Sequence, residues 1–123
     1  MDELEFAERI ARVRARFVAN LTDNIRKTIS TLPRMAGGEH ETMDAIDDAY
    51  RTFHEACGIS ATVGLQATGQ AAKRIDAILI DAFRSRRGLT ANELVQLAEQ
   101  LGGLQSVLEN ETKATNTHEE LSL

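Results

Sequence analysis

Pro33 is the only proline among the 123 residues of this chain. Because proline lacks a backbone donor and disfavours helix in the residue before it, its near absence permits long helices on both sides of position 33. Aromatic residues make up only 4% of the chain, so the core has to consist mainly of Leu, Ile, Val and Ala. The length suits one domain, because two separate cores would each be too small.

Four segments carry apolar residues at steps of three or four, which is the buried stripe of an amphipathic helix. These helices are expected at about 3–32, 42–63, 65–86 and 90–110. A loop over 33–41 contains the Gly37-Gly38 pair, which is the strongest breaker in the chain.

Residue types at the ends of these segments agree with the expected boundaries. Gly88 is predicted to be the C-cap residue of the third helix. Thr90 and Glu93 have the spacing of a capping box, in which each side chain accepts a hydrogen bond from the other residue's amide. The apolar period is lost after Asn110, which predicts a flexible polar tail over 112–123.

No window shows the alternation of a half-buried strand. The expected connections near 64 and 88 are short, so successive helices should be antiparallel neighbours. The sequence therefore predicts an all-α fold: an antiparallel up-down four-helix bundle over 1–111, complete in one chain and expected to be a monomer.

Charge and composition exclude several classes of function. A net charge of −5 disfavours binding to nucleic acid. No apolar run is long enough for a membrane span, and the first residues do not resemble a secretory signal, so the expected location is the cytoplasm. Cys57 is the only cysteine, which excludes an internal disulfide or a multi-cysteine metal site. No metal or cofactor is expected.

The region around His54 is unusual for a helix optimised only for stability. Gly58 falls inside the expected second helix, where glycine costs about 1 kcal/mol relative to alanine. It lies one turn after His54 on the same face, so it leaves space beside the imidazole. His54 falls about 100° from the centre of the apolar stripe, at the border between core and solvent. Cys57 lies close to that centre and is expected to be a buried, inert side chain.

The segment from His54 to Leu65 resembles the motif of histidine-containing phosphotransfer (HPt) domains, which take part in two-component phosphorelays. The family motif is His-x-x-Lys-Gly-x-Ser/Ala-Ala-x-x-Gly, on the second long helix of a four-helix bundle. His54 and the residues that follow it match in register, and the expected helix order agrees over roughly 10–110. The matching positions are His54, Gly58, Ser60, Ala61 and Gly64. The usual lysine is replaced by Cys57.

The resemblance implies a phosphoryl carrier. His54 would accept a phosphoryl group on Nε2 from a receiver-domain aspartate and pass it to another receiver, because a neutral imidazole is nucleophilic near pH 7. The implied partners are receiver domains of response regulators or a hybrid histidine kinase, and the receiver would supply the Mg²⁺. The chain has no ATP-binding half, so it would not phosphorylate itself. The docking surface is expected around His54, on the first and second helices.

Three other residues are candidates for the site. If the turn between the second and third helices lies near residue 65, Asp76 lies level with His54 and is predicted to orient its imidazole, as the corresponding residue does in HPt domains. Arg51, one turn before His54, and Lys73, on the third helix, are both candidates for replacing the missing lysine charge.

Two alternative functions remain open. The chain could be a pseudo-HPt adaptor, which binds a receiver or kinase without carrying phosphate. It could also be an unrelated helical interaction module in which His54 has no role.

Overall fold

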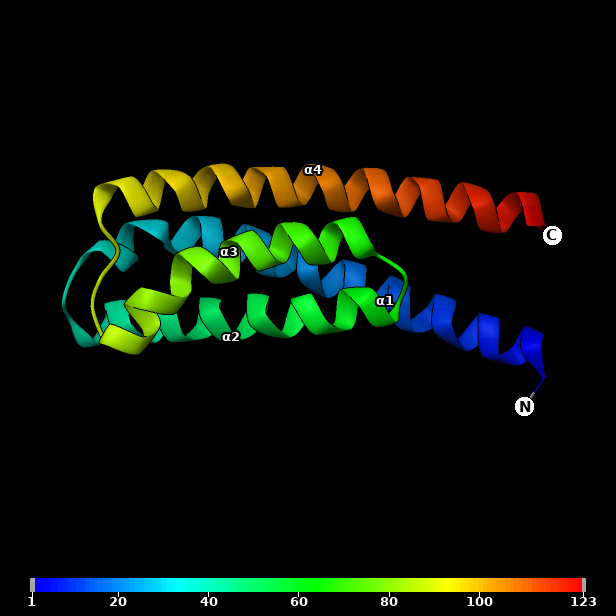
Figure 1. Ribbon diagram of the computed structural model, residues 1–123, viewed down its shortest axis with the longest axis horizontal. Coiled ribbons are helices and arrows are strands. Elements are labelled where there is room, and N and C mark those ends of the chain that lie inside the picture. The colour runs from blue at the N-terminus through cyan, green and yellow to red at the C-terminus, as the bar shows by residue number, and fades with distance from the viewer. Residues whose placement is uncertain (1, 123) are drawn as a thin grey trace.

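The computed structural model describes residues 2–122, with side chains as far as residue 116. Within these limits the chain forms four α-helices, one short 3-10 helix and no strand, so the all-α prediction is confirmed. Figure 1 shows the helices packed side by side as a bundle. Their bounds are α1 (Glu3–Thr31), η1 (Leu32–Ala36), α2 (His40–Thr62), α3 (Gln66–Ser85) and α4 (Ala91–Ser122).

The core is almost entirely aliphatic, as the low aromatic content predicts. Phe53 is its one fully buried aromatic side chain among the described residues, and it belongs to a core cluster that includes Leu or Ile side chains from each of the four helices. The main buried side chains are Leu21, Ile25, Ile46, Phe53, Ile75, Leu79, Leu97, Leu101, Leu104 and Leu108.

Helices α2 and α3 run in opposite directions and pack closely. Near one end, Asp47 forms an ion pair with Arg86 at 2.7 Å. Near the other end, a Cβ added to Gly69 would lie 3.1 Å from that of Ser60, so the glycine allows the two backbones to approach each other. Gly64, with φ +80°, forms the turn between the two helices, in a conformation that favours glycine.

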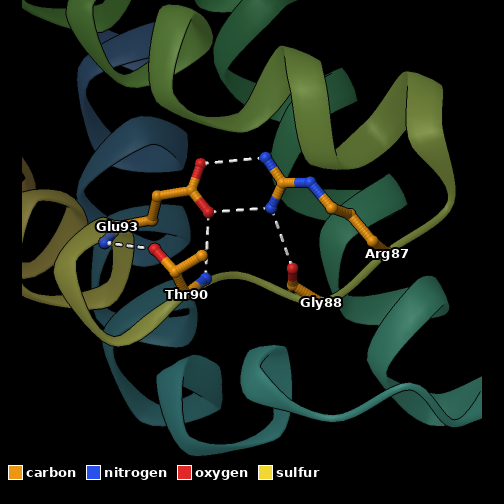
Figure 2. A network of polar contacts seen from close by, with 4 residues as sticks. All are labelled: Arg87, Gly88, Thr90 and Glu93. Carbon is orange, nitrogen blue, oxygen red and sulfur yellow. Dashed lines mark hydrogen bonds and ion pairs between the residues drawn. The ribbon is translucent and has the colours of Figure 1, made fainter.

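A network of charged and polar groups fixes the corner between α3 and α4 (Figure 2). Arg87 binds both carboxylate oxygens of Glu93, at 2.8 and 3.1 Å. The predicted capping box is confirmed, because the Glu93 amide donates to Thr90 Oγ1 and the Thr90 amide donates to Glu93 Oε1. The ion pair and the box share one carboxylate, so they hold the end of α3 and the start of α4 together.

The predicted C-cap at Gly88 is wrong. Arg86 is the residue that leaves α3 in the left-handed conformation, with φ 54°. Gly88 is needed for a different reason: an added Cβ would collide with the backbone carbonyl of Gly37. The adjacent amide of Leu89 donates to the carbonyl of Met35 at 2.7 Å, so the chain joins η1 by direct backbone contact.

The expected end of the fourth helix near residue 110 is wrong, because α4 continues as helix to Ser122 and includes the stretch that the sequence predicts as a flexible polar tail. Thr112 and Asn116 line a small hollow together with Ala11 and Arg14 of α1, so the neighbouring helix supports this polar stretch. Side chains beyond residue 116 lie outside the described residues. Figure 1 shows the N-terminal end of α1 and the C-terminal end of α4 at the same end of the bundle, past the turn between α2 and α3.

No helix in the described part of the chain combines the length and the apolar character that a bilayer span requires.

Candidate functional site

His54 lies in the middle of α2 with its side chain 64% exposed. The helix turns its core face, with Phe53 and Ala56, into the bundle. His54 therefore falls on the border of the face that packs against α3, as the apolar pattern predicts, and its imidazole is open to a molecule arriving from solvent.

Asp76 of α3 holds one nitrogen of this imidazole. Its Oδ1 lies 3.3 Å from His54 Nδ1, and its side chain is only 18% exposed. Because a carboxylate accepts hydrogen bonds and cannot donate them, a neutral His54 carries its proton on Nδ1. The lone pair is then on Nε2, which has no hydrogen-bond partner among the described residues. The structure thus brings together the two residues that the sequence places at the same level.

Tyr50 is a neighbour whose contact with the imidazole the sequence reasoning missed. Its ring stacks on His54 with the centroids 5.3 Å apart, and on Phe83 of α3 at 4.2 Å. Tyr50 precedes His54 by four residues, a spacing that puts the two side chains on one face of the helix. The stack supports the imidazole from the N-terminal side of α2 and fixes the plane of the ring.

An open groove of about 570 Å³ lies beside His54, between α2 and α3. Gly58 forms part of its wall, and a Cβ added there would meet nothing within 4 Å, so the expected open space is present. The lining residues are His54, Cys57, Gly58, Ala61, Gln66, Gly69, Gln70, Lys73 and Asp76.

Cys57 is less buried than the sequence predicts. The fully buried residues on this part of α2 are Phe53, Ala56 and Ser60, so the centre of the apolar stripe is rotated away from Cys57. The thiol is half-buried and lines the groove beside His54. Burial, and then the negative charge of Asp76, raises the pKa of the Cys57 thiol, so it is neutral near pH 7.

The two candidates for charge compensation differ in position. Lys73 lines the groove together with His54 and Asp76, whereas Arg51 is exposed on α2 and does not line it. Among the described residues that form the groove, Lys73 is the one permanent cation.

Helix α1 does not contribute to this groove, although the expected docking surface includes it. Its side chains Phe17 and Leu21 meet Ala56 and Ile59 on the other flank of α2, where they line a separate hollow of about 200 Å³. The surface beside His54 is therefore built by α2 and α3.

The described residues contain no cluster of three or more His, Cys, Asp or Glu side chains that could hold a metal ion.

No protein-family model, curated protein or solved structure matches this chain. The function of the chain therefore has to be inferred from the residues around His54 and their geometry.

Proposed function

We propose that this chain is a histidine phosphotransfer protein of a two-component phosphorelay. In this proposal the four helices form an HPt-like up-down bundle, and His54 carries the phosphoryl group between receiver domains. The observation that supports it best is the state of His54: exposed to solvent, bound at Nδ1 by Asp76, and free at Nε2 beside an open groove.

The transfer follows from this arrangement. The Nε2 lone pair of His54 attacks the phosphorus of an aspartyl phosphate on the receiver. The N–P bond forms as the P–O bond to the aspartate breaks, and the aspartate leaves as a carboxylate with the bonding electron pair. The imidazole becomes positively charged, and its Nδ1–H remains bonded to Asp76, whose negative charge stabilises it.

Passing the group on is the reverse reaction with a second receiver. The partner's Mg²⁺ neutralises charge on the phosphoryl oxygens, and positioning accounts for much of the remaining barrier. The chain needs no cofactor of its own. The proposal places this exchange in the cytoplasm, between a monomeric carrier and receiver domains that include that of a hybrid kinase.

The test is transfer of label from receiver domains phosphorylated with acetyl [³²P]phosphate. We expect label on the wild-type chain that is labile in acid and stable in alkali, and none on His54→Gln. His40→Gln is the matched control, because His40 is a second exposed histidine on α2 and its loss should not reduce labelling. Equal label on His54→Gln and the wild type would show that His54 is not the acceptor.

Cys57 favours a second candidate, the pseudo-HPt adaptor. A neutral thiol occupies the position of the usual motif lysine, which lowers the positive charge available to a phosphoryl group. An adaptor would bind receiver domains equally well with and without the His54→Gln change, and it would acquire no label. Binding measured by calorimetry beside the labelling assay separates the two functions.

A further inference from the structure

The charges around His54 pose a problem for a phosphorylated imidazole. A phosphoryl group brings a charge of about −1.5 to −2, and the carboxylate of Asp76 lies 3.3 Å from the other nitrogen of the same ring. The phosphoryl group on Nε2 and the carboxylate at Nδ1 lie at opposite ends of the ring. The single positive charge of the imidazolium between them offsets only part of their combined negative charge, so the site stays net negative unless another cation approaches. The usual lysine is absent from α2, and the thiol of Cys57 supplies no positive charge.

The opposite wall of the groove holds a cation at the level of Cys57. Because α2 and α3 run in opposite directions, the step of three residues from His54 to Cys57 matches the step back from Asp76 to Lys73. Cys57 and Lys73 therefore face each other across the groove, and both line it. The positive charge of Lys73 also acts on the Cys57 thiol, opposing the increase in its pKa that burial and Asp76 cause.

The side chain of Lys73 suits a phosphoryl group at this place. An ammonium group on a flexible four-carbon stem binds phosphate as a point charge without a fixed geometry. Lys73 is exposed, and the open space at Gly58 leaves room for its ammonium to approach Nε2. Lys73 and Asp76 lie one helical turn apart, so α3 presents one positive and one negative group to the two ends of the phosphohistidine.

We infer that Lys73 binds the phosphoryl group on His54, and that the cation of this site lies on α3 instead of α2. The inference rests on the proposed function and assigns to Lys73 the role that the motif gives to the residue at position 57.

The experiment measures the rate of labelling from the same ³²P-phosphorylated receiver domains. Lys73→Gln should slow labelling about tenfold or more, as expected when a charge-stabilising group is lost. Arg74→Gln is the matched control, because it removes a neighbouring exposed cation that does not line the groove. It should change the rate by less than about twofold. The melting temperature should be the same for both variants.

Rescue distinguishes phosphoryl binding from a structural effect. In the Lys73→Gln background, Cys57→Lys should restore the rate to within about threefold of the wild type, since it returns the cation to the opposite wall. If that variant does not fold, 2-bromoethylamine can alkylate the thiol of folded Lys73→Gln. The chain has one cysteine, so this reaction adds an ammonium at position 57 alone.

The possible results separate the two claims. A wild-type chain that takes no label overturns the proposed function and this inference with it. A labelled wild-type chain whose Lys73→Gln variant reacts as fast as Arg74→Gln overturns the inference alone. The inference is also overturned if Lys73→Gln is labelled slowly and neither Cys57→Lys nor alkylation of the thiol restores the rate. A cation on the facing wall should replace the lost one if its role is to bind the phosphoryl group.

Discussion

The two nitrogens of the His54 imidazole have different surroundings, and this difference gives the residue its proposed chemistry. Nδ1 faces a mostly buried carboxylate of α3, while Nε2 has no hydrogen-bond partner among the described residues, on a side chain that is largely exposed and lines an open groove. Tyr50 stacks on the ring and limits its rotation. The contact with Asp76 fixes the tautomer of the imidazole, and the contact with Tyr50 fixes the plane of its ring. The Nε2 lone pair is therefore oriented before a partner binds.

The role of Asp76 can be tested without a partner protein. Asp76→Ala removes the acceptor of Nδ1–H, so the neutral imidazole should lose its preference for the proton on Nδ1. Nitrogen-15 chemical shifts of His54 measure the two tautomers directly. With a phosphorylated receiver, the same variant should accept label about ten- to a hundredfold more slowly. Asp81→Ala, at an exposed acid further along α3, should change neither result. An unaltered tautomer ratio in Asp76→Ala would contradict the orienting role.

Gly58 is expected to improve access to His54 at the expense of helix stability. An added Cβ has open space around it, so Gly58→Ala should stabilise the protein by about 1 kcal/mol through helix propensity. Gly58→Leu should also fold, but its side chain would cover the imidazole and slow labelling several-fold. Urea unfolding and the receiver assay measure these two effects.

Gly102 of α4 is the matched control for Gly58, because it is also helical with open space around an added Cβ. Gly102→Ala should give a similar gain in stability, and Gly102→Leu should leave labelling unchanged. Fast labelling of Gly58→Leu would show that Gly58 does not serve access.

At the scale of elements, a side chain from another helix caps the start of α3. Leu65 precedes α3 and offers no capping side chain. Instead the carboxylate of Glu111 on α4 accepts from the amides of Ala67 and Thr68, at 3.0 and 2.8 Å. A negative charge at this position also interacts favourably with the helix dipole. This contact fixes the end of α3 nearest the turn, where the groove begins.

The corner between α3 and α4 should make stability depend on pH. The hydrogen bond from Arg87, aided by the Thr90 amide, lowers the pKa of Glu93 from its ordinary value of 4.5 to about 2. A carboxyl group with a depressed pKa in the folded state stabilises the fold above its unfolded pKa, and this contribution is lost as the pH falls through the folded value.

Glu93→Gln should therefore melt at a lower temperature than the wild type at pH 7, by a few degrees. The difference should shrink between about pH 4.5 and pH 2, where the wild-type carboxylate becomes protonated as well. Thermal melts followed by circular dichroism across this range measure it. Glu99→Gln, at an exposed glutamate of α4, should show little difference at any pH. A gap between Glu93→Gln and the wild type that is unchanged at pH 2 would exclude an ionic origin.

The sequence predicts a helix end correctly where the capping residues lie close together in the chain. The Thr90–Glu93 box lies within four residues, so its two hydrogen bonds follow from spacing alone. The cap from Glu111 joins residues more than forty positions apart, and it exists only once α4 packs against α3. Gly88 was misassigned for the same reason, because the carbonyl that excludes a side chain there belongs to Gly37.

At the scale of the whole molecule, the helical period and the position of Pro33 predict the four helices. The expected place of the turn near residue 65 predicts that His54 and Asp76 lie side by side. Neither signal fixes how far each helix is rotated about its axis. The core centre on α2 lies closer to Ala56 than to Cys57, and this rotation places the thiol in the groove. The expected end of α4 near residue 110 is too early, because the loss of apolar period marks the end of the buried stripe and not the end of the helix.

The extension of α4 can be tested by removing residues 112–123, which lie past the expected domain boundary. Ala11 and Arg14 of α1 line a hollow with Thr112 and Asn116, so the truncated chain leaves this part of α1 without its neighbour. Helices that lose packing in this way are only marginally stable on their own. The far-ultraviolet helical signal should therefore fall by more than the removed residues account for. Hydrogen exchange should become faster at the amides around Ala11 and Arg14, while the His54 tautomer should not change. A helical signal per molecule equal to that of the full chain would show that the segment is not helical in solution.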